Sequence, residues 1–432
     1  MLVAVSTGQT LAVTLILISC GFCRCAAAAD AVALPPVRFA TVVSLETREL
    51  ATVTGSRLDH IAVLACTAGE CAPIPFQYDA RDADGHWLLD NRAAPPADAA
   101  LGADGALLFM AADAGDRLPQ MQLPDATAVE IEIADPLSGA RRWTYVVASV
   151  APAARNPRRY VSYDPAGDVL HGTRVSLGFA HGLPNYLALS DAPGANLLDR
   201  LKVRATATFL FGLLRFARSE DDLRAEFLGW HAGPIRVLRA QRQWVRIGWG
   251  IRSPTFLSYA TFYRDYAELP VGLRLNFPPT YFFGGIEVRA LLDLRDLRGW
   301  SVRVPGGGEP IAIGGGMGRR KAWLNELTAD WFVLLGPQVS LLERIALSES
   351  LAGVRVRLSY SEGDRPQPPE SVPGGWPVIG YRLDRWEHVA AGQHQLSSIS
   401  YALPPAMDAQ EFIQASRTPL TVRVQPLGQN RR

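Results

Sequence analysis

Residues 201–209 read Leu-Lys-Val-Arg-Ala-Thr-Ala-Thr-Phe, so that apolar and polar side chains alternate along the whole stretch. Successive side chains of a β-strand point to opposite faces of its sheet, and this period of two therefore predicts a strand with one buried face. The same alternation recurs in further segments of the chain, at 129–133, 245–252, 271–277, 354–358 and 420–424. Many such strands with Gly/Pro turns between them are typical of antiparallel sandwiches. We predict an all-β fold.

Helical periodicity is confined to short segments at 220–228, 320–335 and 408–416, the last with Asp408 as N-cap and Glu411 completing a capping box. A linker-like run, Ala-Pro-Ala-Ala-Arg-Asn-Pro, fills positions 151–157. A chain of 432 residues has room for two or three domains of roughly 100–200 residues. We expect a small N-terminal β-sandwich over 35–150 and a larger antiparallel β-sandwich, supersandwich-like with a few short helices, over 160–426.

The overall charge of the chain gives no reason to expect a strongly charged partner. The net charge is +1, which gives no reason to expect a nucleic acid as partner. Nearly all basic residues are arginines, and Lys202 and Lys321 are the only lysines. This bias fits either many fork-shaped anion contacts or the codon preference of a GC-rich genome. No apolar run of about 18 residues follows the N-terminus, so we expect no internal transmembrane span.

The first residues resemble an export signal. Residues 11–22 form an apolar run too short to span a bilayer comfortably, and four alanines follow at 26–29. Cleavage after Ala28 or Ala29 would make residues 1–29 a signal peptide, although no Lys or Arg precedes the apolar run. Alternatively, Leu-Ile-Ser-Cys-Gly at 17–21 is a lipobox, with Cys20 carrying a lipid anchor. A buried helix of a cytosolic protein is the third interpretation. We expect export to the periplasm or the outer-membrane surface.

The cysteines fit that compartment. After cleavage near Ala28 only Cys66 and Cys71 remain, in the sequence Cys-Thr-Ala-Gly-Glu-Cys. Two such cysteines in an oxidising compartment predict a disulfide that closes a small hairpin. Free thiols and a metal site are the alternatives, and no histidine stands beside the two cysteines.

An acidic stretch follows the cysteines and offers a candidate cation site. Asp79, Asp82 and Asp84, with Gly85 after them, are the residues that a Ca²⁺ loop would use, and no cofactor other than Ca²⁺ is suggested by the sequence. The competing interpretation is a β-hairpin turn, since Asp-Gly readily supplies the positive φ angles of such turns.

Several short segments resemble a known group of proteins. They are Pro-Phe-Gln-Tyr-Asp at 75–79, the apolar strand around Phe109, Gly-Pro-Ile-Arg-Val at 233–237, Thr-Phe-Tyr-Arg-Asp at 261–265 and Gly-Tyr-Arg-Leu at 380–383. Together they resemble exported bacterial proteins in which a small N-terminal β-domain precedes a galactose-mutarotase-like supersandwich. This resemblance covers most of residues 35–425 and implies a carbohydrate-binding or sugar-acting protein. The histidine and carboxylate pair of the sugar-acting members cannot be assigned, so no catalytic residue is carried over.

Candidate ligand-binding residues combine aromatic rings with cationic groups on predicted strands: Trp244, Arg246, Arg264, Tyr281, Trp386 and His388. Rings of this kind stack on sugars, and guanidinium groups bind carboxylates. The competing interpretation is that the aromatics are core residues, the arginines are solvated, and Arg264 pairs with Asp265. His388 and His394 would converge only if a turn brought them together.

Two functions remain open. One is a non-catalytic envelope protein that binds or scaffolds a protein partner through its sheets, and the other is a carbohydrate-binding or sugar-acting protein. A groove lined by aromatics, arginine and a histidine paired with a carboxylate favours the second. A smooth sheet with a broad apolar patch favours the first. No P-loop, G-x-S-x-G or H-E-x-x-H motif is present.

Overall fold

A computed structural model describes residues 33–91, 99–118, 126–190, 195–209, 212–248, 250–363 and 377–427. Within these ranges the chain consists mainly of antiparallel strands, which confirms the all-β prediction. The predicted signal peptide and Cys20 lie outside the described residues. No helix of the described chain is long and apolar enough to cross a membrane.

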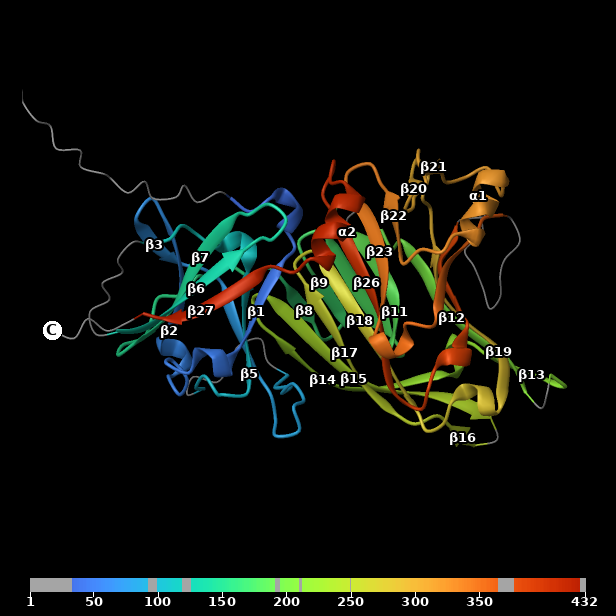
Figure 1. The fold of residues 1–432 in the computed structure, drawn as a ribbon, viewed down its shortest axis with the longest axis horizontal. Helices are drawn as coiled ribbons and strands as arrows, with labels where there is room; N and C mark the ends of the chain where they lie inside the picture. The colour runs from blue at the N-terminus through green and yellow to red at the C-terminus, as the bar shows by residue number, and fades with distance from the viewer. Residues whose placement is uncertain are drawn as a thin grey trace, which may run out of the picture.

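The first region, residues 42–149 together with 421–426, is a sandwich of two sheets (Figure 1). Its three-stranded sheet has the order β1 (Val42–Glu46), β5 (Gly105–Met110), β4 (Phe76–Ala80). Its five-stranded sheet has the order β27 (Thr421–Pro426), β6 (Ala126–Ala134), β7 (Arg141–Ser149), β2 (Ile61–Thr67), β3 (Glu70–Pro73). A hydrophobic core with contributions from both sheets fills the space between them.

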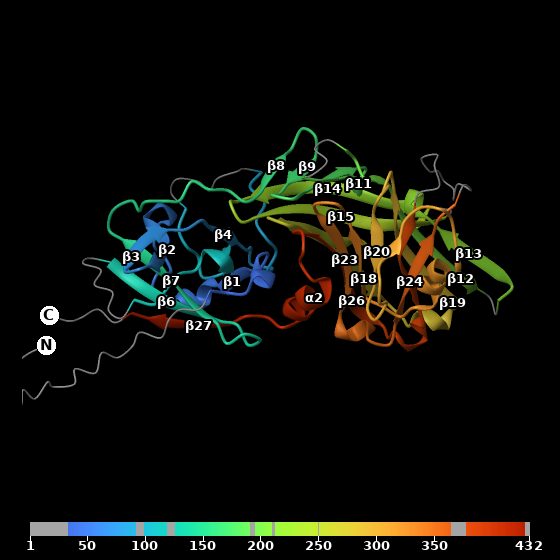
Figure 2. The same ribbon diagram turned by 90° about the horizontal axis from the view of Figure 1, so that it is seen from above.

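The second region, residues 160–403, holds the larger sheets (Figure 2). The largest has the order β14 (Leu223–Ala232), β15 (Arg236–Gly248), β17 (Phe256–Tyr263), β18 (Tyr266–Leu275), β26 (Gly392–Leu403), β23 (Ser340–Leu347), β22 (Trp331–Leu335), β20 (Ser301–Arg303), β21 (Ile311–Ala312), with β16 (Ile251–Arg252) paired to β15. A five-stranded sheet has the order β13 (Leu214–Arg218), β12 (Leu198–Phe209), β19 (Phe283–Leu294), β25 (Val378–Asp384), β24 (Arg355–Ser361). A four-stranded sheet has the order β11 (Leu183–Leu189), β10 (Val175–Ala180), β9 (Val169–His171), β8 (Ser162–Asp164).

Helices are short in the described chain. The α-helices are α1 (Arg319–Trp323) and α2 (Ala409–Arg417). The 3-10 turns are η1 (Pro36–Arg38), η2 (Thr47–Leu50), η3 (Leu58–His60), η4 (Ala111–Asp113), η5 (Glu220–Asp222), η6 (Pro279–Tyr281), η7 (Leu324–Glu326), η8 (Glu349–Leu351) and η9 (Trp386–His388).

Strand β5 is buried on both faces and joins the cores of the two regions. Leu107 and Phe109 belong to the core of the first region, whereas Ala106, Leu108 and Met110 belong to that of the second. Neighbouring residues of a strand point to opposite faces, so one strand can serve two cores. This explains why its sequence, Gly-Ala-Leu-Leu-Phe-Met, is apolar throughout instead of alternating.

The alternating segments form strands, with one difference. Segments 201–209, 129–133, 354–358 and 420–424 lie wholly or almost wholly in β12, β6, β24 and β27. Segment 245–252 is not one continuous strand: β15 ends at Gly248, and β16 returns antiparallel to it. Gly250 between them has φ +78°, a backbone conformation that glycine adopts without strain.

Two of the three helix predictions are wrong over most of their length. In 220–228, Ser219 caps a single 3-10 turn, and strand β14 follows because residues from Leu223 onward pair with β15. In 320–335, α1 and η7 end by Glu326, and Trp-Phe-Val-Leu-Leu at 331–335 forms β22. That apolar run pairs on both sides, with β20 and β23, and is a buried strand.

The third helix and the last strand tie the chain end to the first region. Helix α2 begins after Asp408, whose carboxylate accepts the N–H groups of Gln410 and Glu411 as the N-cap prediction requires. Beyond it, β27 pairs with β6, so the six residues at 421–426 complete the sheet of the first region (Figure 1). The sequence had placed this segment with the larger sandwich.

Glu343 on β23 is a buried acid in the large sheet. It is 3% exposed, and its Oε1 atom has no hydrogen-bond partner in the described chain. Burial raises the pKa of Glu343 to about 8, against a smaller opposing effect of the hydrogen bond with Ser400. The folded protein therefore keeps this carboxyl protonated at neutral pH, whereas the unfolded chain ionises it.

This acid makes folding stability depend on pH. The pKa of Glu343 is higher in the folded than in the unfolded chain, so stability falls as pH rises from about 5 to 8. The Glu343→Gln variant removes the ionisation, and we expect it to be more stable than the wild type by about 2 kcal/mol or more at pH 8, and similar at pH 5. Urea unfolding at both pH values measures this. The exposed Glu349→Gln variant is the control, and an unchanged pH dependence in Glu343→Gln would contradict the interpretation.

Candidate functional site

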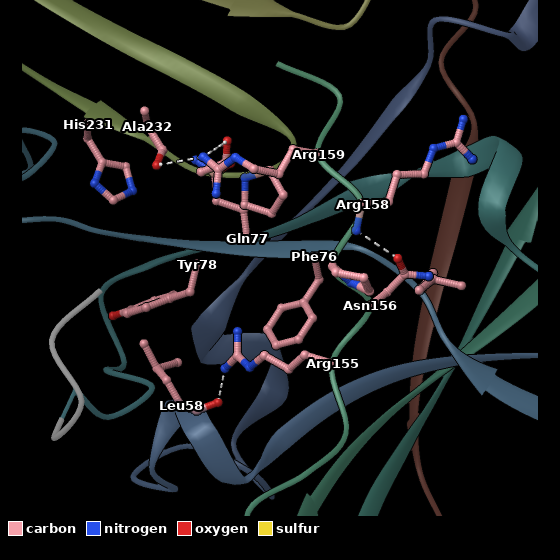
Figure 3. A pocket seen from close by; sticks show the side chains of 14 residues that line it. Leu58, Phe76, Gln77, Tyr78, Arg155, Asn156, Arg158, Arg159, His231 and Ala232 are labelled. Atoms are coloured by element: carbon pink, nitrogen blue, oxygen red, sulfur yellow. Dashed lines mark hydrogen bonds between the residues drawn. The ribbon is translucent and has the colours of Figure 1, made fainter. Parts of the chain in front are cut away.

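A cleft lies where the two regions meet the linker at 151–159 (Figure 3). Its volume is about 290 Å³, close to the lower limit of roughly 300 Å³ for small-molecule sites. Strand β4, the linker and the end of β14 contribute most of its wall. The lining residues are Leu58, Ile74, Phe76, Gln77, Tyr78, Arg155, Asn156, Pro157, Arg158, Arg159, His231, Ala232, Gly233 and Pro234.

A buried polar network forms one side of this cleft and connects β4 with the second region. Gln77 and Asp79 pair in register with Leu108 and Ala106 of β5, so they face the second core. The Gln77 carbonyl accepts the N–H groups of Ile235 and Arg236 at 3.0 and 2.9 Å, and its amide donates to Asp79 at 2.7 Å. Arg236 Nε donates to the Asp79 carboxylate at 2.6 Å.

The close approach of the two regions requires glycine at position 233. A Cβ added to Gly233 would stand 2.0 Å from the side chain of Gln77, a distance that no real contact allows. Asp79 is 2% exposed, and its burial acts to raise the pKa of its carboxyl. Arg236, His231 and Gln77 outweigh that effect and hold the pKa of Asp79 below its usual value.

His231 carries a positive charge in this network. Its Nε2 lies 3.0 Å from Asp79 and its Nδ1 lies 2.9 Å from Asp90, so both ring nitrogens face carboxylates and both act as donors. Burial opposes the charged imidazole, but the hydrogen bonds and charges of Asp79 and Asp90 outweigh it and raise the pKa of His231. The ring is therefore fixed in place as an imidazolium.

The linker supplies the remaining cations of the cleft. Arg155 donates to the Leu58 carbonyl, and its guanidinium lies 4.7 Å over the ring of Phe76 (Figure 3). Arg159 donates to the carbonyls of Gly233 and Ala232 at 3.0 and 3.4 Å. Burial lowers the pKa of both arginines, which shows that water stabilises their charge less than in the open solvent.

The linker backbone is held by Asn156. Its amide donates to the Pro73 carbonyl at 3.0 Å, and its side-chain oxygen accepts the N–H of Arg158 at 2.9 Å. Arg158 places its guanidinium 4.6 Å over the ring of Tyr160. Arg155, Arg159 and His231 thus lie together at the cleft, whereas the Arg158 guanidinium points away from them toward Tyr160 (Figure 3), and none of the lining residues, all within the described chain, is acidic.

None of the ligand-binding residues predicted from the sequence lines this cleft. Trp244 is half-buried on β15, and Arg246 on the same strand pairs with Asp222 at 3.2 Å. Arg264 pairs with the fully buried Asp265 at 2.5 Å, as the competing interpretation expected.

The remaining predicted residues lie on two neighbouring 3-10 turns, η6 and η9. Trp386 is a core residue, 6% exposed, whose indole donates to the Leu383 carbonyl. Tyr281 and His388 are exposed. His394 does not converge with His388: its ring nitrogens contact the Ser350 hydroxyl and the Ala390 carbonyl.

The predicted cation site does not assemble as proposed. Asp79 is engaged by Arg236 and His231 and does not join Asp82 and Asp84. The Asp82 carboxylate accepts the N–H groups of Asp84 and His86, and Gly85 has φ +82°, which is the geometry of a turn. Ligand atoms of Asp82, Asp84 and His86 lie within 4.8 Å of one another at the surface, and a cation there stays a prediction.

The predicted disulfide is present in the structure. Cys66 and Cys71 are bonded and pair in register across the β2–β3 hairpin. Free thiols and a metal site at this pair are therefore not what the structure shows.

Sequence reasoning missed the linker arginines. Residues 151–157 were predicted to be a linker, although three arginines within five positions, at 155, 158 and 159, are an unusual charge density in and directly after a linker. That density was the available signal. The partners of Arg155 and Arg159 come from segments about 70 to 100 positions away in the chain, which no local pattern reveals.

The network predicts a large cost for removing its central charge. The Asp79→Asn variant leaves Arg236 and His231 buried without their carboxylate, and we expect it to lower the free energy of unfolding by about 3–5 kcal/mol. The exposed Asp82→Asn variant is the matched control and should change it by no more than about 0.5 kcal/mol. Urea titration measures both, and equal effects would contradict the role given to Asp79.

Comparisons with known proteins yield fold similarity alone. No protein-family model and no curated protein matches the sequence. Similar solved structures include a protein of glycosyl hydrolase family 38 from Enterococcus faecalis and an α-mannosidase from Enterococcus faecalis V583, each at 9% identity and a TM-score of 0.46. The alignments cover 91% and 89% of this chain, but 46% and 44% of those chains, so the chain spans less than half of their length.

Proposed function

We propose that this protein is an exported envelope protein that binds an acidic carbohydrate, one carrying carboxylate groups, in the cleft between its two regions. The observation that carries the proposal is the composition of the cleft: Arg155, Arg158, Arg159 and the imidazolium of His231 line it, and none of its lining residues is acidic. Binding of an anion would supply a carboxylate to Arg155, which is held by a main-chain carbonyl.

The arginines are held in positions suited to that task. Arg155 has no carboxylate within ion-pair distance among the described residues, and it donates a hydrogen bond to the main-chain carbonyl of Leu58. A guanidinium offers several donors in one plane, so a group held by one carbonyl keeps other N–H groups for a carboxylate. Its lowered pKa indicates that an incoming anion would relieve the cost of burying its charge.

The remaining wall suits a ring-shaped polar ligand. Tyr78 has its hydroxyl fixed by the N–H of Gly102 at 3.0 Å, so its ring is held rigidly. The Arg155 guanidinium lies 4.7 Å over the ring of Phe76 and presents a second planar group. A sugar unit with a carboxylate uses both features, since its ring contacts flat surfaces and its charge contacts arginine. The resemblance to galactose-mutarotase-like proteins supports the same ligand class by fold analogy.

The side chains at the cleft are better suited to binding a ligand than to catalysing a reaction. His231 separates the cleft from the carboxylates of Asp79 and Asp90, and both carboxylates are hydrogen-bonded to its ring. General acid or base catalysis needs a carboxyl or imidazole whose proton can reach the substrate. The scaffold hypothesis stays a prediction, because it requires a protein partner on a sheet face, whereas the cleft is a defined cationic site.

Removal of the linker arginines tests the proposal. Isothermal titration with a galacturonate tetramer should show binding to the wild type that weakens as NaCl is raised, and no binding of maltotetraose, its uncharged counterpart. The Arg155→Gln/Arg158→Gln variant should bind the acidic tetramer at least tenfold more weakly, since each charge-assisted hydrogen bond contributes about 1.5–3 kcal/mol.

The matched control replaces exposed arginines of the first region, as Arg48→Gln/Arg423→Gln, and should bind like the wild type. Equal binding of the neutral and the acidic tetramer, or unchanged binding by the linker variant, would overturn the proposal. Separate titrations with oligosaccharides of other uronic acids identify the preferred sugar.

The export part of the proposal has its own test. Mass spectrometry of the mature protein from a bacterial host should find an N-terminus immediately after Ala28 or Ala29, since cleavage there follows the small-x-small pattern. The Cys20→Ser variant should be processed in the same way. A diacylated Cys20 as the first residue would show that the protein carries a lipid anchor and is not cleaved near Ala28. An unprocessed chain would contradict export.

A further inference from the structure

Large apolar side chains are exposed at the end of the second region that lies farthest from the first (Figure 1). They come from two segments, one at the β12–β13 connection and one between β18 and β19. We call this set the tip, and its members are Leu213 (83% exposed), Leu214 (54%), Phe277 (43%), Tyr281 (72%) and Phe282 (49%). Scattered single residues of this kind are normal on a protein surface, but a cluster of this kind indicates an interaction site.

Ring contacts hold the two segments of the tip together. Phe209 pairs in register with Leu214 on one side and with Phe283 on the other, so the three residues lie across neighbouring strands. The ring of Phe283 lies 5.6 Å from that of Phe209. The rings of Phe277 and Phe282 lie 4.9 Å apart, edge to face. Residues about 70 positions apart are therefore neighbours at this end of the second region.

Basic residues predominate around the tip, and Glu387 on the neighbouring turn η9 is an exposed acid beside it. Residues 201–219 and 269–286 contain no Asp or Glu. Arg215, Arg252 and Arg274 are exposed, and no carboxylate of the described chain lies within ion-pair distance of any of them. Arg218 stacks over the ring of Phe216 at 4.4 Å and donates to the Arg246 carbonyl, which connects β13 to β15 at this end.

We propose that the tip docks on the surface of a lipid bilayer that contains anionic phospholipids. Aromatic and aliphatic side chains of a peripheral protein insert into the headgroup boundary, while arginines beside them bind lipid phosphates. Exposed apolar side chains and exposed arginines are both present at this end of the molecule. The positive charge of the arginines favours an anionic surface.

The same charges argue against a second copy of this chain as occupant. A two-fold dimer brings the same patch of both subunits together. Two copies of Arg215, Arg252 and Arg274 would then share one interface, to which residues 201–219 and 269–286 supply no carboxylate, and like charges brought together across an interface are unfavourable. A lipid headgroup supplies the missing negative charge.

The tip and the arginine cleft are separate sites. The cleft lies at the junction of the two regions, whereas β13 and β16 mark the opposite end of the long axis (Figure 1). Docking through the tip leaves the cleft open, so the bilayer inference stands independently of the proposed ligand.

Vesicle co-sedimentation tests the proposal with the full chain carrying Cys20→Ser, which removes the alternative lipid anchor. Vesicles of phosphatidylcholine with 30% phosphatidylglycerol should sediment the protein, vesicles of phosphatidylcholine alone should not, and 0.5 M NaCl should weaken the binding about tenfold or more. Both Tyr281→Ser/Phe282→Ser and Arg215→Gln/Arg274→Gln should lower the affinity for anionic vesicles about tenfold or more.

Matched controls lie in the first region. Leu137→Ser/Val150→Ser removes equally exposed apolar groups, Arg48→Gln/Arg423→Gln removes equally exposed charges, and both should bind as the wild type does. Circular dichroism spectra that match the wild type show that each variant is folded. Sedimentation that is unaffected by the tip variants would overturn the proposal. So would a tip-dependent dimer in sedimentation velocity without lipid, because it would identify a second copy as the occupant.

Discussion

The buried ion pair between Asp79 and Arg236 determines how the two β regions fit together. A buried carboxylate and guanidinium are stable only with each other and with further hydrogen bonds, so the strands that carry them have one acceptable placement. Gln77 supplies those bonds by accepting two main-chain N–H groups of the second region. Strand β5 beside it presents apolar side chains to both cores, and the contact between the regions therefore combines hydrophobic burial with a directional polar network.

The cleft follows from this arrangement. Since Gln77 and Asp79 are committed to the second region, the alternate residues Phe76 and Tyr78 face the other side of β4, where they meet the linker. The linker crosses there, and main-chain carbonyls position its arginines. The Leu58 carbonyl orients the Arg155 guanidinium without neutralising it, so a cation remains at the cleft although the protein as a whole is almost neutral.

The structure gives a reason why two of the many cationic residues of this chain are lysines and not arginines. Lys202 pairs with Asp293 at 2.5 Å, and Lys321 pairs with Glu362 while its ammonium donates to the carbonyls of Gly314 and Gly316. Both lysines are buried. A compact ammonium with three rotatable donors fits such a pocket of acceptors, which a planar guanidinium does not match. The cationic groups at the cleft and at the tip are arginines.

The local features of this protein were determined by its sequence. Period-two alternation is a property of neighbouring residues, and it predicted β12, β6 and β27. The N-cap at Asp408 and the hairpin disulfide depend on groups two to five positions apart, and they too were predicted. The candidate site could not be predicted in this way. Asp79 resembles a cation ligand among its sequence neighbours, and only the fold places it against Arg236, 157 positions away. Residues 320–335 were predicted to be a helix, yet pairing with two strands makes residues 331–335 strand β22. Spacing along the chain fixes which face a side chain occupies, whereas long-range packing decides which partner that face meets.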